Sequence, residues 1–211
     1  MLKNILQKVL GKSKFYSPDY WETRYANGGN SGDGSYGRLS TFKAEIINDF
    51  LKTENISSAI ELGCGDGHQL SIINYPKYTG LDISPSIIKA CRKKFEGDDR
   101  KSFIVYKPGL IESGELKKAD LALSLDVLYH LVEKEVYTNY LKDLFSYSNK
   151  YVLVYSTNYN EVEAMHIVHR KFTDDVATMF PDWKLEKEIK NKYPGIGEQE
   201  SLADFYIFVK K

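Results

Sequence analysis

The chain has 211 residues, and its 29 lysine and arginine residues are balanced by 29 aspartate and glutamate residues. This length is enough for one domain with a buried core, and 42% hydrophobic with 27% charged residues excludes wholesale disorder. A neutral chain lacks the broad basic face with which proteins hold duplex nucleic acid, and only local basic patches stay open. No nucleic-acid partner is therefore expected.

Cysteine is rare, and Cys64 and Cys91 do not form a CxxC pair. A disulfide framework and a cysteine-rich zinc site are excluded, and no metal site is predicted. No apolar run approaches the roughly 18 residues that cross a bilayer, and no signal-peptide pattern begins the chain. We expect a cytoplasmic protein that is a monomer or a homodimer.

Residues 1–14 have a helical pattern of apolar positions, with lysines at 3, 8, 12 and 14. The pattern predicts a short basic amphipathic helix, which packs on its own domain or on a partner subunit, or makes weak contact with an acidic membrane surface. Five of the 15 glycines lie within residues 28–37. This stretch predicts a lid or loop, with a plain linker as the alternative. Residues 1–39 thus form an N-terminal segment before a domain at 40–211.

From residue 58 onward, short apolar runs alternate with helical patterns, which is typical of an α/β domain. Amphipathic helices are predicted around Phe42 to Leu51, from Ser84-Pro85 onward and over 133–147. We predict a Rossmann-like, mostly parallel sheet with helices on both faces. Its seven strands are expected at 59–62, 78–82, 103–106, 121–125, 151–156, 184–189 and 205–209.

The strongest motif runs from Glu61 to Gly67, with the sequence Glu-Leu-Gly-Cys-Gly-Asp-Gly, directly after the first predicted strand. Such glycines permit a tight turn and let a ligand lie against bare backbone, and we expect a helix to follow them. Asp82 ends the second strand 19 positions after Gly63, where a carboxylate can bind the hydroxyls of a ribose. The combination predicts a nucleoside site.

The kind of nucleoside is indicated by glycine spacing and charge. Dinucleotide sites favour Gly-x-Gly-x-x-Gly because the helix start then receives a pyrophosphate, whereas here the third glycine comes one residue early. Glu61 and Asp66 flank the turn and would repel phosphates. These acids favour a cation, such as the amino group or sulfonium of a phosphate-free nucleoside.

These motifs resemble those of class I S-adenosylmethionine-dependent methyltransferases over residues 40–211. Glu61 to Gly67 is similar to their first motif, Leu81 to Ser84 to their acidic second motif, and Asp120 to Leu131 to their fourth-strand motif. The resemblance implies S-adenosylmethionine as cofactor and an antiparallel last strand. It also implies that Gly63 and Gly65 approach the methionine part, that Asp82 holds the ribose and that Ile83 packs on adenine. Glu61, Cys64 and Asp126 complete the cofactor site implied by these motifs.

The segment from Tyr20 to Leu39 is similar to stretches that precede the core in a bacterial branch of this family and often cover the cofactor. This likeness places Tyr36 and Arg38 near the cofactor's carboxylate or at the closure of the pocket, because phenol and guanidinium both suit an anionic group. A surface loop with a structural tyrosine is the alternative.

The acceptor site is expected beyond the carboxyl ends of the strands. If a helix begins at Asp126, this acid shares a face with His130 and can orient it as a general base. If residues 163–171 are helical, they carry His166, His169 and Arg170 on one face, where the three would suit a phosphate or carboxylate. A structural role for His130 and a solvated face for 163–171 are the alternatives, and His68 is assigned a structural role.

The predicted function is methyl transfer from S-adenosylmethionine to a small molecule, with an anionic acceptor left open. The family's adenine and amide methylating members carry Pro-Pro and an aromatic residue after the fourth strand, whereas this chain has Asp126-Val127-Leu128-Tyr129. Oxygen is therefore the expected atom, in a surface-polysaccharide sugar or small metabolite. The alternatives are an NAD(P)-dependent oxidoreductase and a non-catalytic nucleoside-binding module.

Overall fold

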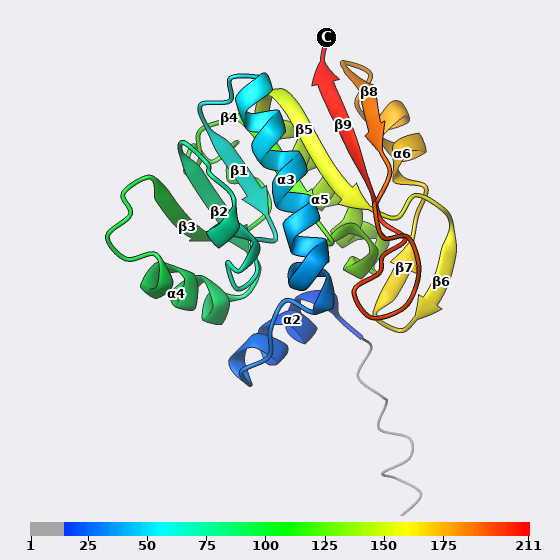
Figure 1. Ribbon diagram of the computed structural model, residues 1–211, viewed down its shortest axis with the longest axis horizontal. Coiled ribbons are helices and arrows are strands. Elements are labelled where there is room, and N and C mark those ends of the chain that lie inside the picture. The colour runs from blue at the N-terminus through cyan, green and yellow to red at the C-terminus, as the bar shows by residue number, and fades with distance from the viewer. Residues whose placement is uncertain (1–14) are drawn as a thin grey trace, which may run out of the picture.

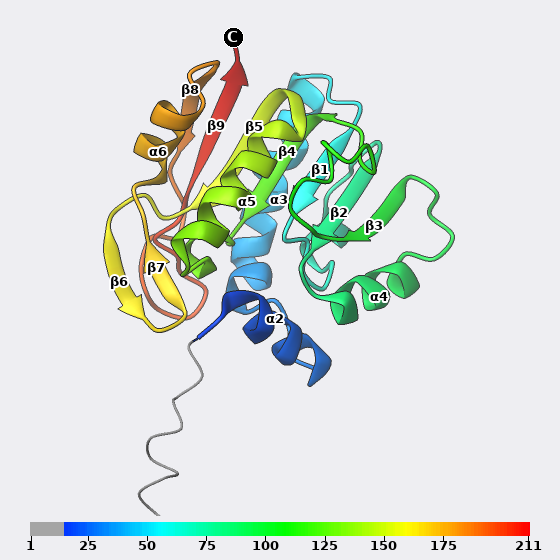
Figure 2. The same cartoon turned by 180° about the vertical axis from the view of Figure 1, so that it is seen from behind.

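The computed structural model describes residues 15–211, so the amphipathic helix predicted over residues 1–14 lies outside the described residues. The main sheet of the described chain is twisted and has helices packed on both of its faces, as Figures 1 and 2 show from opposite sides. This arrangement confirms the predicted Rossmann-like α/β class.

The sheet has seven strands in the order β3-β2-β1-β4-β5-β9-β8. β1 pairs in parallel with β2 and β4, β2 with β3, and β4 with β5, whereas β9 is antiparallel to both β5 and β8. The predicted antiparallel last strand is therefore confirmed. The strands are β1 (Ala59–Leu62), β2 (Tyr78–Asp82), β3 (Lys101–Val105), β4 (Ala119–Leu125), β5 (Ser148–Ser156), β8 (Trp183–Ile189) and β9 (Asp204–Lys210).

Helices α3 (Gly37–Thr53), α4 (Pro85–Lys94) and α5 (Lys134–Ser146) occupy the predicted positions. Ser84 caps α4, since its Oγ accepts a hydrogen bond from the backbone of Ile87 at 3.1 Å. Sequence reasoning did not predict α2 (Ser17–Ala26) and α6 (Phe172–Met179). In Figure 1, α2 lies at the end of the sheet toward which β1 and β5 point.

The helix expected directly after the glycine turn is wrong. A one-turn 3-10 helix, η2 (Gln69–Ile72), takes its place, and β2 begins six residues after it ends. The intervening Asn74-Tyr75-Pro76 segment leaves little room for an α-helix, because proline disfavours helical conformation in the residue before it.

The condition that residues 163–171 are helical is not met. The structure has an antiparallel hairpin of β6 (Glu161–Ala164) and β7 (Ile167–His169), with Val162 opposite Val168. β-branched residues at these positions favour extended backbone over helix.

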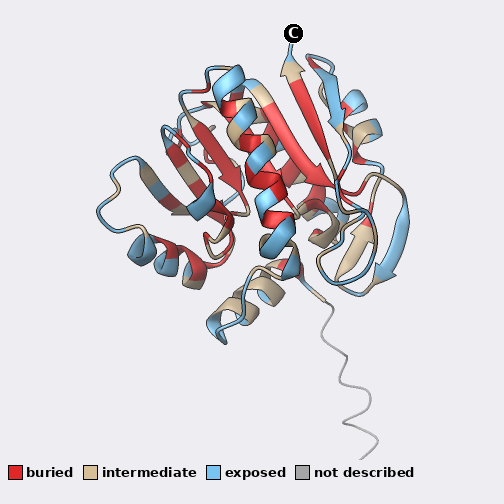
Figure 3. Ribbon diagram, viewed as in Figure 1, coloured by how far each residue is buried: buried red, intermediate tan, exposed pale blue. Residues whose placement is uncertain are grey.

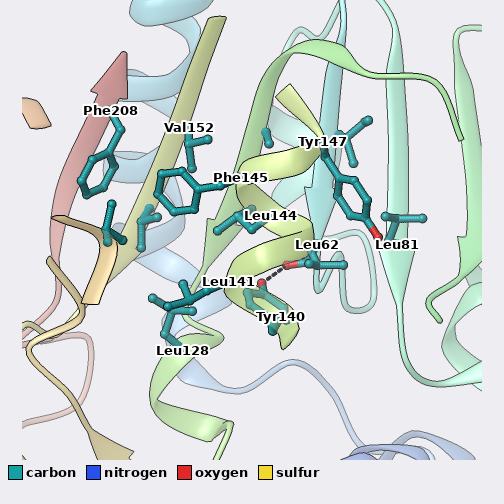
Figure 4. Packing of buried hydrophobic residues seen from close by; sticks show 14 of the residues in the cluster. Leu62, Leu81, Leu128, Tyr140, Leu141, Leu144, Phe145, Tyr147, Val152 and Phe208 are labelled. Atoms are coloured by element: carbon teal, nitrogen blue, oxygen red, sulfur yellow. Dashed lines mark hydrogen bonds between the residues drawn. The ribbon is translucent and has the colours of Figure 1, made fainter. Parts of the chain in front are cut away.

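Two apolar clusters pack on opposite faces of the sheet. The cluster around α5 joins it to Leu62, Leu81 and Phe208, and the hydroxyl of Tyr140 donates a hydrogen bond to the backbone oxygen of Leu62 at 2.6 Å (Figure 4). The other cluster joins the inner sides of α3 and α4 to the sheet. Figure 3 shows the central strands and the inner face of α3 buried, whereas α2 is intermediate or exposed after its buried first residue, Ser17. The end of β1 is therefore held firmly where the glycine turn begins.

Candidate functional site

The glycine turn after β1 needs its glycines for two reasons. Gly63 and Gly65 have φ angles of 88° and 53°, in the left-handed region that favours glycine. A Cβ atom on Gly63 would lie 2.5 Å from Cγ2 of Val127, and one on Gly65 would lie 2.3 Å from Oγ of Ser31. The turn thus presents bare backbone to its surroundings, as its sequence predicted.

Asp82 lies beside this turn at the end of β2. One of its carboxylate oxygens accepts a hydrogen bond from the backbone N–H of Gly65, and the other accepts one from Ser84, both at 3.0 Å. Burial raises the pKa of Asp82 to about 6, although these backbone donors act in the opposite direction. Backbone donors therefore fix the orientation of the carboxylate, but they do not offset the effect of burial on its pKa.

Glu61 is a second buried acid, at the end of β1. Its carboxylate accepts a hydrogen bond from the hydroxyl of Tyr78 at 2.7 Å. Burial raises the pKa of Glu61 to about 7, against the lowering effects of this hydrogen bond and of the charge on Lys43. Two acids with raised pKa values thus lie near one another, as functional sites often arrange them.

Asp126, after β4, has a different environment. One carboxylate oxygen binds Nζ of Lys43 at 2.5 Å, and the other accepts a hydrogen bond from the hydroxyl of Tyr129 at 2.8 Å. Lys43 comes from α3, is only 1% exposed and lies 5.1 Å from the ring centre of Tyr155. The φ angle of 59° at Asp126 turns the chain away from the strand at this point. The β4 end therefore carries a satisfied ion pair.

Helix α2 and the segment after it cover this end of the sheet. The carboxylate of Glu22 accepts hydrogen bonds from the hydroxyls of Ser84 and Ser86, which lower its pKa. Ser31 donates its backbone N–H to Asp66 at 2.9 Å and accepts a hydrogen bond from the backbone of Asp66 at 2.9 Å. These contacts hold the N-terminal segment against the glycine turn and α4.

The space that they cover is a cavity partly open to solvent. The predicted site residues that line this cavity are Glu61, Gly63, Cys64, Gly65, Asp82, Ile83, Asp126 and His130. They come from the carboxyl ends of β1, β2 and β4 and from the turns that follow, where ligands bind in open α/β sheets. Tyr36, Arg38, His166, His169 and Arg170 are not among the lining residues.

Tyr36 and Arg38 do not line the cavity themselves, although Tyr36 contacts Asp66, which does. The Tyr36 hydroxyl donates to the carboxylate of Asp66 at 2.7 Å, and its ring stacks on that of His68 with centroids 4.3 Å apart. The Arg38 guanidinium donates to the backbone oxygen of Gln199 at 2.6 Å and lies 4.5 Å from the ring centre of Tyr193. Both side chains fasten the N-terminal segment to its neighbours in this structure.

His130 lines the cavity but is not held by Asp126, because the helix assumed to start at that acid does not form. A 3-10 turn, η3 (Leu128–His130), follows β4 instead. Nδ1 of His130 lies 3.3 Å from the backbone oxygen of His166, and its ring meets Trp21 edge-on with centroids 5.0 Å apart. Burial lowers the pKa of His130 to about 4, so the imidazole is neutral at pH 7.

The predicted basic face of residues 163–171 does not form, because the segment is a hairpin. Nitrogens of Arg170 donate to the backbone oxygens of Leu131 and Val132 at 2.7 and 2.8 Å. His169 contacts Thr157 through Nδ1 at 2.7 Å and Glu163 through Nε2 at 2.8 Å. The ring of His166 stacks on Tyr20 with centroids 5.6 Å apart. The three side chains are thus divided among separate contacts.

Sequence reasoning missed several residues that line the cavity, among them Trp21, Tyr25, Lys43 and Gln69. Lys43 had a detectable signal, because it lies four residues after Leu39 and four before Ile47, on the buried side of an amphipathic helix. A buried lysine at such a position requires an acidic partner. Trp21, Tyr25 and Gln69 stand in no comparable pattern.

Two further findings concern residues 15–211. No group of three or more histidine, cysteine, aspartate or glutamate side chains in that range could hold a metal ion. Its helices also include none with the length and apolar character needed to cross a membrane.

Comparison with known proteins agrees with this geometry. Residues 60–147 match a family model described as a methyltransferase domain. The N-methyltransferase NodS from Bradyrhizobium japonicum, solved with S-adenosyl-l-homocysteine, aligns with a TM-score of 0.70 and 12% identity, over 92% of this chain and 98% of that one. A search of curated protein sequences gives no match.

Two other solved structures share the fold. Magnesium protoporphyrin IX methyltransferase from Synechocystis, solved with bound SAM, has a TM-score of 0.66 and 13% identity, over 95% of this chain and 100% of that one. A putative O-methyltransferase from Klebsiella pneumoniae has a TM-score of 0.60 and 11% identity, over 99% and 94%.

The sheet order and the glycine turn define a Rossmann-like domain with a cavity at the carboxyl ends of its parallel strands. Residues 60–147 thus match a methyltransferase-domain model, and the described chain shares the fold of solved methyltransferases, two of them solved with SAM or S-adenosyl-l-homocysteine bound. Known structures of this fold include nitrogen- and putative oxygen-methylating proteins, so the fold alone does not fix the atom that is methylated.

Proposed function

We propose that this protein transfers the methyl group of S-adenosylmethionine to a hydroxyl oxygen of a small molecule. The sulfonium of this cofactor supplies an already activated methyl group. The protein's task is then to orient the two reactants, exclude water and accept the acceptor's proton. Cys64 and Cys91 are both free and buried, which fits the proposed cytoplasmic location.

One observation supports the cofactor assignment most directly: the buried carboxylate of Asp82 lies against the bare backbone of Gly65, and both line the cavity at the strand ends. Asp82 would hold the ribose hydroxyls, and Ile83 would pack on the adenine. Acids at the ends of β1 and β2 would stabilise a cationic ligand, and a cation would in turn lower their raised pKa values. A diphosphate would meet repulsion from the same groups.

His130 is the proposed proton acceptor. The backbone oxygen of His166 can only accept a hydrogen bond, so Nδ1 of His130 must carry the proton in this contact. Because the ring is neutral at pH 7, Nε2 then holds an unshared electron pair. The hairpin carbonyl fixes the tautomer, which is the role that sequence reasoning gave to Asp126. His130 can therefore take a proton from a hydroxyl group placed beside it in the cavity.

The acceptor is proposed to be a neutral hydroxyl compound, such as a sugar of a surface polysaccharide or a small metabolite. Arg170 and His169, expected to bind an anionic group, already contact protein oxygens. The aromatic rings of Trp21 and Tyr25 line the cavity and suit a sugar face or a planar molecule.

The proposal is tested in two steps. Calorimetry should show binding of S-adenosylhomocysteine and none of NADH, and the reverse result would favour an oxidoreductase. The purified protein is then incubated with S-adenosylmethionine carrying a labelled methyl group and with a panel of sugars and phenolic metabolites. Label found in a methyl ether supports oxygen transfer, whereas label in a methylamine would overturn the assignment to oxygen. Cofactor binding without transfer to any compound of a full metabolite extract would favour a non-catalytic module.

A further inference from the structure

Gln69, the first residue of η2, carries an oxygen without a hydrogen-bond partner in the part of the chain that the structure describes. The residue is 7% exposed and lines the cavity just after the glycine turn. Its Nε2 donates a hydrogen bond to the backbone oxygen of Ser40 on α3 at 2.9 Å. Because a carbonyl oxygen can only accept, this contact fixes which end of the amide faces α3. The other end, Oε1, is buried with no hydrogen-bond partner among residues 15–211.

The carboxylates of Asp66 and Asp126, which line the same cavity, do have hydrogen-bond partners. Asp66 accepts hydrogen bonds from Tyr36, from Ser31 and from the backbone of His68. Asp126, which faces α3, has its two oxygens bound by Lys43 and Tyr129. Buried polar atoms in native proteins nearly always have partners, so an orphaned acceptor on a cavity wall indicates a donor supplied by a ligand.

The position of Gln69 shows which part of the cofactor would supply that donor. Asp82 and Ile83 lie at the β2 side of the glycine turn, where the proposed function places ribose and adenine. Gln69 lies beyond the turn on the side of α3. A ligand that lies across Gly63 and Gly65 with its adenosine at β2 directs its other end toward α3. In S-adenosylmethionine that end is an amino acid, whose ammonium group is a hydrogen-bond donor only.

We propose that Oε1 of Gln69 receives the α-ammonium group of S-adenosylmethionine and thereby sets the position of the donor's amino-acid end. This inference rests on the proposed function and adds a residue that the family motifs do not supply. Gln69 would make the site select cofactors with an intact amino-acid end over bare thioadenosines. Its second contact, to Ser40, would keep the amide oriented toward the ligand.

The test compares ligands that differ at this one group. Calorimetry measures the affinities of S-adenosylhomocysteine and of its deaminated analogue, in which hydrogen replaces the α-amino group, for the wild type and for Gln69→Leu. We expect Gln69→Leu to weaken S-adenosylhomocysteine binding about tenfold or more, because a charge-assisted hydrogen bond is lost. The affinity for the deaminated analogue should stay within about twofold of the wild-type value.

Two further variants separate ligand binding from structure. Gln69→Glu keeps an acceptor oxygen but loses the donor to Ser40, so it should retain wild-type affinity for S-adenosylhomocysteine if the ammonium is the partner. Gln199→Leu is the matched control, because this glutamine also contacts the start of α3, through the backbone N–H of Arg38, but does not line the cavity. It should bind both ligands as the wild type does.

Equal losses for both ligands in Gln69→Leu, or a Gln69→Glu variant as weak as Gln69→Leu, would reduce Gln69 to a structural role and overturn the inference. The proposed function would survive that result, since the wild type would still bind S-adenosylhomocysteine. A wild-type protein that binds neither ligand would instead refute the proposed function, and this inference with it.

Discussion

The acids on the two sides of the cavity, at the ends of β1 and β2 and at the end of β4, differ in their charge partners. At the ends of β1 and β2, Glu61 and Asp82 are buried and hydrogen-bonded, and neither forms a direct ion pair with another of residues 15–211. Burial raises their pKa values to about 7 and 6. At the end of β4, Asp126 binds Lys43 directly and also accepts a hydrogen bond from Tyr129. The first side is incomplete without a cation and is therefore suited to a ligand. The second side is complete, which suits a structural and positioning role.

Removing the lysine should break the complete side. Lys43→Met leaves Asp126 largely buried without its cation, and breaking a buried ion pair in this way costs about 3–5 kcal/mol. The free energy of unfolding, measured in urea, should fall by that amount. The double variant Lys43→Met/Asp126→Leu should regain most of the loss, because no unpaired charge is left. A single variant as stable as the wild type would contradict the view that this pair holds the β4 end.

Removing the carboxylate should break the incomplete side. Asp82→Ala deletes the charge-assisted hydrogen bonds proposed for the ribose, and two such bonds correspond to an affinity loss of about 100-fold or more. Calorimetry with S-adenosylhomocysteine measures it, and circular dichroism checks that the variant stays folded. Asp49→Ala, at an exposed position of α3, is the control and should bind normally. An unchanged dissociation constant for Asp82→Ala would show that ribose binds elsewhere.

His130 tests whether the β4 side contributes chemistry as well as structure. With a pKa of about 4 it is a weak base, so its loss should lower turnover at the small end of the general-base range, about 100-fold. His130→Gln should leave the affinity for S-adenosylhomocysteine nearly unchanged. In the wild type, kcat should fall as pH drops through the pKa of His130 in the ternary complex, and the variant should lose that dependence. A variant with full turnover on the identified acceptor would return His130 to a packing role.

The side that was predictable from sequence is the one built from consecutive residues. The glycine turn and Asp82 are each read within a few positions of a strand end, where backbone geometry dictates the residue types. The β4 side depends on contacts distant in sequence, such as the pairing of Lys43 with Asp126 over 83 positions. Helical spacing also failed there, since a left-handed φ at Asp126 and the hairpin turn before Ile167 interrupt the expected helices. No local pattern reports such tertiary partners.

The smallest expected effect sharpens the comparison through pH. The pKa of Glu61 is raised from 4.5 to about 7 in the folded protein, so its stabilising proton is present below pH 4.5 and is lost as pH rises through 7. Glu61→Gln keeps an acceptor for Tyr78 but has no proton to lose. We expect the free energy of unfolding of the wild type to fall between pH 4 and pH 6 by about 2 kcal/mol more than that of Glu61→Gln. Urea unfolding of both proteins at the two pH values measures this difference.

The same substitution should weaken binding of a cationic ligand. Because a cation favours the ionised acid, the wild type should bind S-adenosylmethionine more tightly as pH rises from about 6 to 8, whereas Glu61→Gln should lose part of that rise. S-adenosylhomocysteine lacks the sulfonium charge and should show a shallower dependence in both proteins. Parallel pH profiles for the two ligands would mean that Glu61 does not sense the sulfonium. The burial of acids at the ends of β1 and β2 would then lower the stability of the fold without raising the affinity for S-adenosylmethionine.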